Sequence, residues 1–296
     1  MKYSYSVVIP HYNSSDLLPK MLASIPGRSD IQVIVCDDGS DAHHVEALKR
    51  LEHPGLELVL LEHHDAGYAR NEGLRRAKGE WFIAADADDW FMPGAFDVLD
   101  RYRDMKDIDV LMFCIDVEEV DGRKKKILAN ESVLKYLKKP GKDTEKFIRF
   151  RSCTPWNKLV RLSFIRENNI CFEDTEINND VMYAFQVGLR AGNIHVIRDE
   201  LYCLGMNQRS ITRRKKSIER EFTFYLSRQK QNGFYRALGL MEFWRNDVLY
   251  IPYILMKHGV TGLFEFLRMW LARKDERNEA RKAYLHILDG RDAKTP

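Results

Sequence analysis

Residues 67–90, GYARNEGLRRAKGEWFIAADADDW, contain the pattern that decides the fold. The part at 69–77 has helical spacing, and WFIAA at 81–85 is a short apolar run typical of a fully buried strand. The acidic group DADD at 86–89 follows that run directly. A helix leading into a buried strand is typical of a mostly parallel sheet covered on both faces. We therefore expect the acidic group at the carboxyl end of a buried strand.

The same alternation of strand and helix precedes this stretch. Apolar runs predict strands at 5–10, 31–36, 56–61 and 109–117, and helical spacing predicts helices at 15–25 and 42–51. Polar groups follow two of these strands, HYN at 11–13 and DDGS at 37–40. In open α/β sheets, ligands bind beyond the carboxyl ends of the strands. The sequence therefore predicts one site formed by three polar groups on one edge of the sheet.

The remaining segments predict the domain organisation. Residues 118–146 are charged and poorly patterned, which favours an insertion or a flexible loop. After about residue 212 the pattern is helical to the end. We predict one domain at 1–212, with one half at about 1–117 and the other at about 147–212. Residues 213–296 would form a helical C-terminal region.

Composition excludes several other classes of protein. The chain of 296 residues has 47 Lys and Arg against 44 Asp and Glu, and this near balance, without a nucleic-acid-binding motif, argues against nucleic acid as a partner. Its five cysteines form no CxxC pair, which argues against a disulfide framework and a zinc site. No apolar run approaches the roughly 20 residues that span a bilayer. A cytoplasmic location is the expectation that follows.

The two acidic groups suggest binding of a nucleoside diphosphate. Carboxylates alone would repel its phosphates, but a pair of them can hold a hard divalent cation that bridges to the phosphate oxygens. The group at 86–89 fits this role, and its alternative is a helix cap or a solvated turn. The turn at 37–40 could accept hydrogen bonds from a base or a ribose, and its alternative is a structural turn that leads into a helix.

Taken together, these motifs resemble family 2 glycosyltransferases of the GT-A fold. The resemblance is carried by VVIPHYN at 7–13, VCDDGS at 35–40, the stretch at 67–90, WNKLVR at 156–161, FEDTEINND at 172–180 and RSIT at 209–212. It extends over about residues 5–212, in the order and at the spacing of that family. The resemblance implies that 1–212 is a catalytic domain, with its donor half at about 1–117 and its acceptor half at about 147–212. The most similar members are bacterial enzymes that build capsular polysaccharides, exopolysaccharides or lipopolysaccharides.

The resemblance implies how a nucleotide-sugar donor would be held. Tyr12 would pack on the base with Pro10 beside it, and Asp38, rather than Asp37, would bond the base. Arg70 would lie near the donor phosphates, which suits a guanidinium group. The alternative for Arg70 is a surface ion pair.

The resemblance also implies a metal cofactor, Mg²⁺ or Mn²⁺. Asp88 would be its principal ligand, and Asp86 would lie near both the ribose and the metal. Whether Asp89 shares this role stays open, because members of the family differ at this position.

Asp180 is the residue that the resemblance implies as catalytic base. It would take the proton from an acceptor hydroxyl group, which then attacks the anomeric carbon with inversion. Asn179 stands where the family usually has Glu. The alternatives are a helix-capping role for Asp180, or a base among Glu173, Asp174 and Glu176.

Three further expectations concern the surroundings of the site. Residues 156–158 (WNK) would shape the acceptor region, although Trp156 could equally be part of the core. Residues 209–212 would close over the diphosphate or form plain solvated surface. His63 and His64 are expected in an exposed loop.

The implied function is a metal-dependent, hexosyltransferase-type enzyme of cell-surface polysaccharide synthesis. Its donor would be a nucleotide sugar, with UDP the commonest nucleotide in the family, and its acceptor a lipid-linked or growing glycan. One alternative is a sugar nucleotidyltransferase, but the loop at 10–13 lacks the glycines that such enzymes use to bind a triphosphate. The other alternative is an inactive protein that still binds nucleotide sugars.

The C-terminal region combines basic and aromatic residues. The basic run at 213–216 precedes aromatic helices, and residues 250–274 mix apolar side chains with Lys and Arg. This composition suits a helix lying on an anionic membrane, which predicts peripheral contact with the inner face of the plasma membrane. The alternative is a set of helices that pack their aromatic residues into a core of their own.

Overall fold

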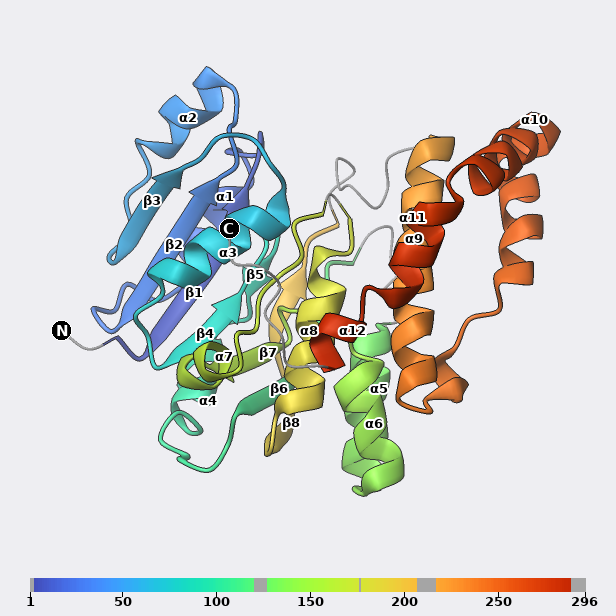
Figure 1. Cartoon of the computed structure of the whole chain (residues 1–296). Coiled ribbons are helices and arrows are strands. Elements are labelled where there is room, and N and C mark those ends of the chain that lie inside the picture. The colour runs from blue at the N-terminus through green and yellow to red at the C-terminus, as the bar shows by residue number, and fades with distance from the viewer. Residues whose placement is uncertain (1–2, 120–126, 176, 207–216, 289–296) are drawn as a thin grey trace. The chain divides into compact units, whose positions relative to one another are not determined.

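The structure is a computed structural model that describes residues 3–119, 127–175, 177–206 and 217–288. The chain divides into two compact units, Met1–Asn207 and Gln208–Pro296 (Figure 1). Each unit is described separately below.

The first unit is built on one eight-stranded mixed sheet with the order β3-β2-β1-β4-β7-β6-β8-β5. The neighbouring strands β3, β2, β1 and β4 all run parallel to one another. Strand β7 runs antiparallel to both β4 and β6, and β5 runs antiparallel to β8. The strands are β1 (Tyr5–His11), β2 (Ile31–Asp37), β3 (Leu56–Leu60), β4 (Trp81–Ala84), β5 (Trp90–Phe91), β6 (Val110–Val117), β7 (Lys158–Arg161) and β8 (Ile194–Leu204). The predicted α/β class with a mostly parallel sheet is confirmed.

Helices cover both faces of this sheet because the strands are apolar on both sides. In β1, Val7 and Ile9 pack into one core with α1 and α4, whereas Val8 packs into the other core with α3 and α8. This division follows from the two-residue period of a strand. The helices are α1 (Leu18–Ser24), α2 (Ala42–Leu48), α3 (Ala66–Arg76), α4 (Ala95–Asp100), α5 (Leu128–Lys138), α6 (Lys142–Phe150), α7 (Leu162–Glu167) and α8 (Asn179–Arg190).

The segment at 118–146 corrects one expectation. It does not form a loop over most of its length, because α5 and the start of α6 occupy it. Val133 of α5 and Ile148 of α6 are buried in the sheet's second core. The many lysines around these few apolar positions hide the helical pattern in the sequence. Residues 120–126 lie outside the described part of the chain.

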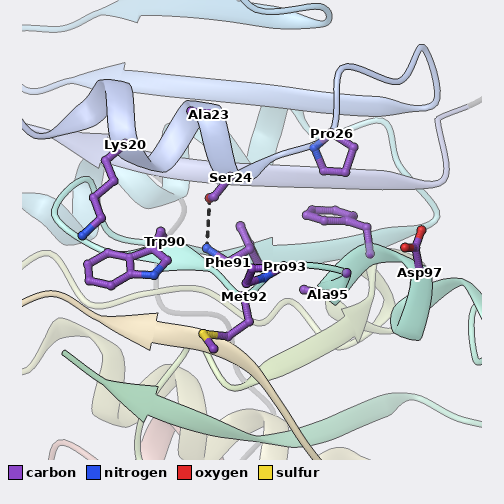
Figure 2. Close-up of a pocket in the computed structure, with 12 residues that line it drawn as sticks. Lys20, Ala23, Ser24, Pro26, Trp90, Phe91, Met92, Pro93, Ala95 and Asp97 are labelled. Carbon is purple, nitrogen blue, oxygen red and sulfur yellow. Dashed lines mark hydrogen bonds between the residues drawn. The ribbon is translucent and has the colours of Figure 1, made fainter. Parts of the chain in front are cut away.

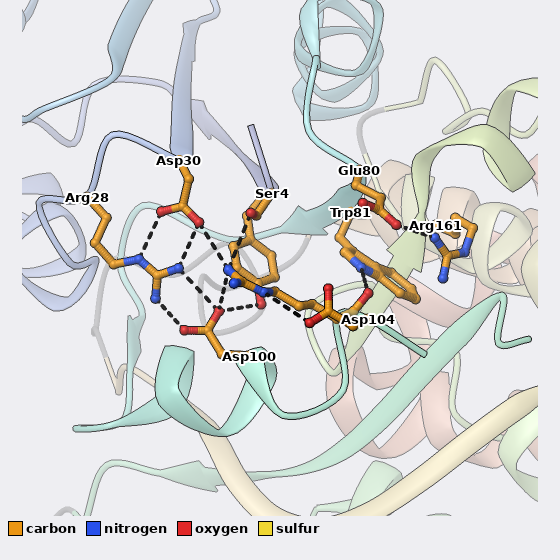
Figure 3. A network of polar contacts seen from close by, with 10 residues as sticks. Ser4, Arg28, Asp30, Glu80, Trp81, Asp100, Asp104 and Arg161 are labelled. Carbon is orange, nitrogen blue, oxygen red and sulfur yellow. Dashed lines mark hydrogen bonds and ion pairs between the residues drawn. The ribbon is translucent and has the colours of Figure 1, made fainter. Parts of the chain in front are cut away.

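A network of ion pairs lies at the amino ends of β1 and β2, at the edge of the sheet away from the acidic groups (Figure 3). The Arg28 guanidinium binds both Asp30, just before β2, and Asp100, at the end of α4, at 2.8 and 2.6 Å. The Tyr5 hydroxyl donates to the same Asp100 carboxylate at 2.9 Å. These contacts join α4 to the sheet, so they have a structural role.

The second unit is helical, as expected for the C-terminal region. Its elements are α9 (Ile218–Ala237), the 3₁₀ turns η1 (Met241–Phe243) and η2 (Asp247–Leu249), α10 (Tyr250–Ala272), α11 (Lys274–Lys282) and α12 (Leu285–Leu288). Phe222 and Tyr225 of α9 pack with Tyr250 and Phe266 of α10 in its core. None of the described helices combines the length and the apolar composition that crossing a membrane requires. The basic run at 213–216 lies outside the described residues.

Candidate functional site

The three predicted polar groups lie on one edge of the sheet. Strand β1 is the central neighbour of both β2 and β4, and all three are parallel. Their register pairs His11 with Asp37, and Val8 with Ala84, so the three strands end next to one another. Pro10, opposite Cys36, is partly exposed at this end of β1. The residues that follow each strand can therefore contribute to a single site.

Asp37 is committed to building the loop after β2. Its carboxylate lies 2.7 Å from Nδ1 of buried His11 and accepts hydrogen bonds from both the hydroxyl and the N–H of Ser40. Burial alone would raise the pKa of Asp37, but the hydrogen bonds from His11 and Ser40 outweigh it and lower this pKa. Asn13 also joins this loop, because its N–H donates to the Ser40 hydroxyl at 2.8 Å.

Asp38 is also buried, and it contacts the loop after β3. It accepts the N–H of His64 at 2.9 Å, and its other carboxylate oxygen lies 2.9 Å from Nδ1 of His63. The predicted exposed loop at 63–64 is exposed, yet it is bonded to Asp38. Gly39 is required between them, because a Cβ there would lie 2.6 Å from the His63 backbone nitrogen and its φ is +73°.

Tyr12 presents an aromatic ring at this edge. Its ring stacks on that of His63 with centroids 4.4 Å apart and planes 16° apart, and Tyr12 remains 48% exposed. The ring is therefore supported from one side and accessible to a ligand. No sequence motif marks His63 as a neighbour of Tyr12. Tyr12 follows β1 and His63 follows β3, and these two strands lie on either side of β2 in the sheet.

The acidic group after β4 contains two different kinds of carboxylate. Asp86 and Asp88 are partly exposed, whereas Asp89 is buried. Asp89 accepts the Tyr202 hydroxyl at 2.9 Å with one oxygen and the Gly205 N–H at 2.8 Å with the other. Both oxygens of Asp89 are thus engaged in attaching the acidic loop to the end of β8.

Tyr202 of β8 organises this loop and was not predicted from the sequence. Its hydroxyl accepts the N–H of Asp86 at 2.8 Å while donating to Asp89. Burial, together with the charge of Asp89, raises the pKa of Tyr202 well above its ordinary value. Trp156 stacks on the Tyr202 ring at 6.0 Å with planes 4° apart.

Arg70 of α3 is buried and connects two halves of the site. One terminal nitrogen donates to Asp86, and the other donates to the Asn179 side-chain oxygen at 2.6 Å. Its Nε has no hydrogen-bond partner among the described residues. Burial would lower the pKa of Arg70, but the charges of Asp86 and Asp180 raise it. Arg70 does form an ion pair, as its alternative reading expects, but the guanidinium is buried and only Asp86 is partly exposed.

Asp180 lies in the first turn of α8, next to the Arg70–Asn179 contact. The N-cap position of this helix is Asn178, so Asp180 is not the capping residue. Burial raises the pKa of Asp180, and the nearby Arg70 charge opposes that rise. Among its predicted competitors, Asp174 is exposed, while Glu176 lies outside the described residues.

The segment before α8 is attached closely to α3. The side-chain amide of Asn71 both donates to and accepts from the Phe172 backbone, at 2.9 Å in each case. A Cβ on Gly67 would lie 1.8 Å from the Glu173 carbonyl oxygen, so only glycine allows this approach. Helix α3 therefore positions Arg70 and the segment that leads to Asp180 together.

Residues 156–158 affect the site mainly from the interior. The buried Lys158 ammonium donates to the carbonyl oxygens of Ser152 and Thr154 and to the Asn157 side chain. Burial lowers the pKa of Lys158 to about 8. Asn157 and Lys158 therefore fold the loop at 152–157. Residues 209–212, the expected lid, lie outside the described part of the chain.

Asp86 and Asp88 are suited to a cation that takes its other ligands from a substrate. Within the described residues, no group of three or more His, Cys, Asp or Glu is arranged to hold a metal. Burial and the charge of Asp86 raise the pKa of Asp88 to about 6. No described side chain donates a hydrogen bond to Asp88. A pair of carboxylates completed by phosphate oxygens is the donor set that Mg²⁺ commonly uses.

A cavity of about 490 Å³ lies beside the acidic group, between α1 and residues 90–97 (Figure 2). Lys20 of α1 places its ammonium 3.0 Å from the centroid of the Trp90 ring, and it also pairs with Glu118. Met92 and Pro93 contribute apolar lining. The cavity begins one residue after Asp89, but its lining residues are distinct from the acidic group.

Comparisons with known proteins find a matching family model and similar sequences. The model described as "Glycosyl transferase family 2" matches residues 6–168. The putative glycosyltransferase EpsH of Bacillus subtilis is 24% identical over 286 residues, which cover 89% of this chain and 80% of that protein. The poly(ribitol-phosphate) beta-N-acetylglucosaminyltransferase TarS of Staphylococcus aureus is 25% identical over 209 residues, 67% of this chain but only 35% of that protein.

Solved structures show the same fold. The structure of S. aureus TarS 1-349 in complex with UDP-GlcNAc has a TM-score of 0.60 at 19% identity, covering 96% of this chain and 81% of that one. Mannosyltransferase PcManGT from Pyrobaculum calidifontis, in complex with GDP-Man and Mn²⁺, has a TM-score of 0.52 at 15% identity, covering 97% and 81%. At these identities the likeness concerns the fold alone, and it confirms the predicted GT-A fold.

Proposed function

We propose a specific reaction for this chain, which belongs to glycosyl transferase family 2: transfer of a sugar from a UDP-sugar to a hydroxyl group of a growing or lipid-linked glycan, with inversion. The observation that carries the proposal is the convergence at one sheet edge. Tyr12 follows β1, Asp38 follows the neighbouring β2, and Asp86 and Asp88 follow β4 on the other side of β1. Arg70 joins this edge to the segment of Asp180.

The nucleoside would bind between the loops after β1 and β2. Tyr12 offers one free ring face for the base, with Pro10 beside it, and the buried Asp38 offers a carboxylate whose position is fixed by the loop after β3. UDP is the proposed nucleotide because TarS, whose fold is similar, was solved with UDP and with UDP-GlcNAc.

Asp86 and Asp88 would hold Mg²⁺ or Mn²⁺. When bound, the cation would supply positive charge that stabilises the departing diphosphate. Arg70 fixes the Asp86 carboxylate in place, and its buried positive charge lies close to the position proposed for the phosphates. The two carboxylates would hold the cation in place, and the cation and Arg70 would compensate the negative charge of the donor.

Asp180 would act as the general base. The raised pKa makes its carboxylate a better proton acceptor than an ordinary, fully solvated Asp. The acceptor oxygen loses its proton to Asp180 and forms a bond to the anomeric carbon, while the bond from that carbon to the diphosphate oxygen breaks on the opposite face. Such general-base assistance contributes roughly 10²–10⁴-fold to the rate.

The test is the substitution Asp88→Asn, with Asp104→Asn as a matched control at an exposed position outside the site. Release of UDP from a panel of UDP-sugars is measured against Mn²⁺ concentration, with a panel of glycan acceptors. We expect Asp88→Asn to lower turnover at least about 100-fold and the control to match the unsubstituted chain. Turnover that survives Asp88→Asn with unaltered Mn²⁺ dependence would contradict the assignment, and release of pyrophosphate from UTP and a sugar phosphate would favour a nucleotidyltransferase.

A further inference from the structure

Helix α10 in the second unit is apolar on two sides. One side carries Tyr250, Ile254 and Phe266, which are buried in the core of that unit. The other side is exposed: Val260 is 76% and Phe264 71% accessible. A surface helix normally has one apolar face, which packs against the core. A second apolar face that is exposed to solvent marks a binding surface.

The exposed residues of the second half of α10 lie in a single row. Val260, Phe264, Leu267 and Leu271 follow the spacing i, i+4, i+7, i+11, which places them on one side of a helix. We refer to these four residues as the outer stripe. The helix is kinked at Gly259, whose φ is +69°, and Met256, 87% exposed, lies just before the kink.

The first half of α10 is fixed by a buried carboxylate of α9. Glu221 accepts hydrogen bonds from the hydroxyls of Tyr250 and Tyr253 and binds the Lys257 ammonium. These contacts engage the inward side of the helix immediately before the kink. Met256 therefore lies on a segment bonded to α9, and Phe266, buried in the same core, fixes the segment after the kink.

The charge of the chain is distributed unevenly. Residues 208–296 contain 19 Lys and Arg against 10 Asp and Glu, a net charge of +9, whereas residues 1–207 contain 28 against 34, a net charge of −6. Arg268 and Lys274 are exposed near the outer stripe, and so are the acidic residues Glu265, Asp275 and Glu276. Two copies of the second unit would repel each other, while an anionic surface would attract it.

We propose that α10 docks this protein onto an anionic lipid bilayer, lying in the membrane plane with the outer stripe and Met256 in the boundary between headgroups and acyl chains. An exposed apolar row on a helix, within a unit of positive net charge, is the pattern of helices that bind in this way. Basic residues near an anionic surface add electrostatic attraction to the apolar insertion. Docking of this kind needs no membrane-spanning helix.

The experiment is flotation of the full chain with vesicles of equal parts phosphatidylglycerol and phosphatidylcholine, compared with vesicles of phosphatidylcholine alone. We expect flotation with the anionic vesicles only, weakened at high salt because the charge attraction is screened. The double variant V260N/F264N should bind roughly tenfold or more weakly, since it removes two inserted apolar side chains. The control Thr261→Asn changes an exposed neighbour outside the stripe and should bind normally.

Two further measurements separate the proposal from its alternatives. Circular dichroism should show equal helix content in all variants, because the substituted residues are exposed. Asp88→Asn should float like the unsubstituted chain, which makes the result independent of the proposed reaction. Absence of flotation, equal flotation of V260N/F264N, or a dimer in light scattering that this variant dissociates would overturn the proposal.

Discussion

The contact between Arg70 and Asn179 gives the sharpest test of how the site is built. The substitution Asn179→Ala removes the acceptor of one charged hydrogen bond and leaves a second buried N–H of Arg70 without a partner, beside Nε. A hydrogen bond to a charged group contributes about 1.5–3 kcal/mol. We therefore expect unfolding of the first unit to become easier by about 2 kcal/mol, a fall in Tm of roughly 4–8 °C for a domain of this size.

The same substitution should separate acceptor binding from donor binding. Asn179 begins α8, so loss of its contact loosens Asp180, whereas the loops around Tyr12 and Asp38 are untouched. We expect a raised acceptor KM and a lowered kcat, with the Kd for UDP unchanged. Calorimetry with UDP and Mn²⁺, together with acceptor saturation curves, measures both quantities.

The companion variant Asn179→Asp tests the electrostatic part. The new carboxylate accepts the hydrogen bond from Arg70 and offsets the guanidinium charge. The stability lost in Asn179→Ala should therefore be regained. The added negative charge beside Asp180 should raise its pKa further, and the acidic limb of the rate profile should move to higher pH. Asn193→Ala, at an exposed position, is the control and should change stability by less than about 0.5 kcal/mol. The reasoning fails if Asn179→Ala unfolds like this control and leaves the acceptor KM unaltered.

Two further predictions concern Tyr202 and Asp65. Tyr202→Phe removes the hydroxyl that joins the Asp86 N–H to Asp89. It should destabilise the first unit by about 1–3 kcal/mol, as measured by urea unfolding. It should also weaken Mn²⁺-dependent donor binding, as measured by calorimetry. Burial, together with the charge of Asp174, raises the pKa of Asp65 from 3.8 to about 6. Ionising Asp65 therefore costs folding free energy, so its contribution to stability is greatest below pH 4 and is lost as the pH rises through 6. Asp65→Asn keeps an acceptor for the first N–H groups of α3. In urea unfolding, the variant should be more stable than the unsubstituted chain by roughly 1 kcal/mol at pH 7.5, and by little at pH 4.5. An equal difference in stability at both pH values would contradict this.

The sheet and its acidic edge were predictable because their signals are local. Each apolar run that ends in a polar group, such as that before Asp86, identifies a buried strand and the edge at which it stops. The choice of Asp38 over Asp37 stays a prediction, because both carboxylates have partners: Asp37 contacts His11 and Ser40, and Asp38 contacts His63 and His64.

The contacts that assemble the site were not predictable from local patterns. Tyr202 lies 116 residues from Asp86 in the chain, and Asn179 lies 109 residues from Arg70. Neither spacing produces a periodic signal, and neither residue type is diagnostic alone. The helices α5 and α6 were missed for a different reason, since dense lysines outweighed the few apolar positions that pack inward.

The dependence of the segment at 171–178 on α3 limits how this enzyme could be redesigned. A chimera that exchanged only that segment with one from a relative would lose the Asn71 amide pair and would place new backbone against Gly67. The smallest transplantable module is therefore the segment together with α3. Because α3 also carries Arg70, such a graft would also replace the residue that we propose to lie beside the donor phosphates.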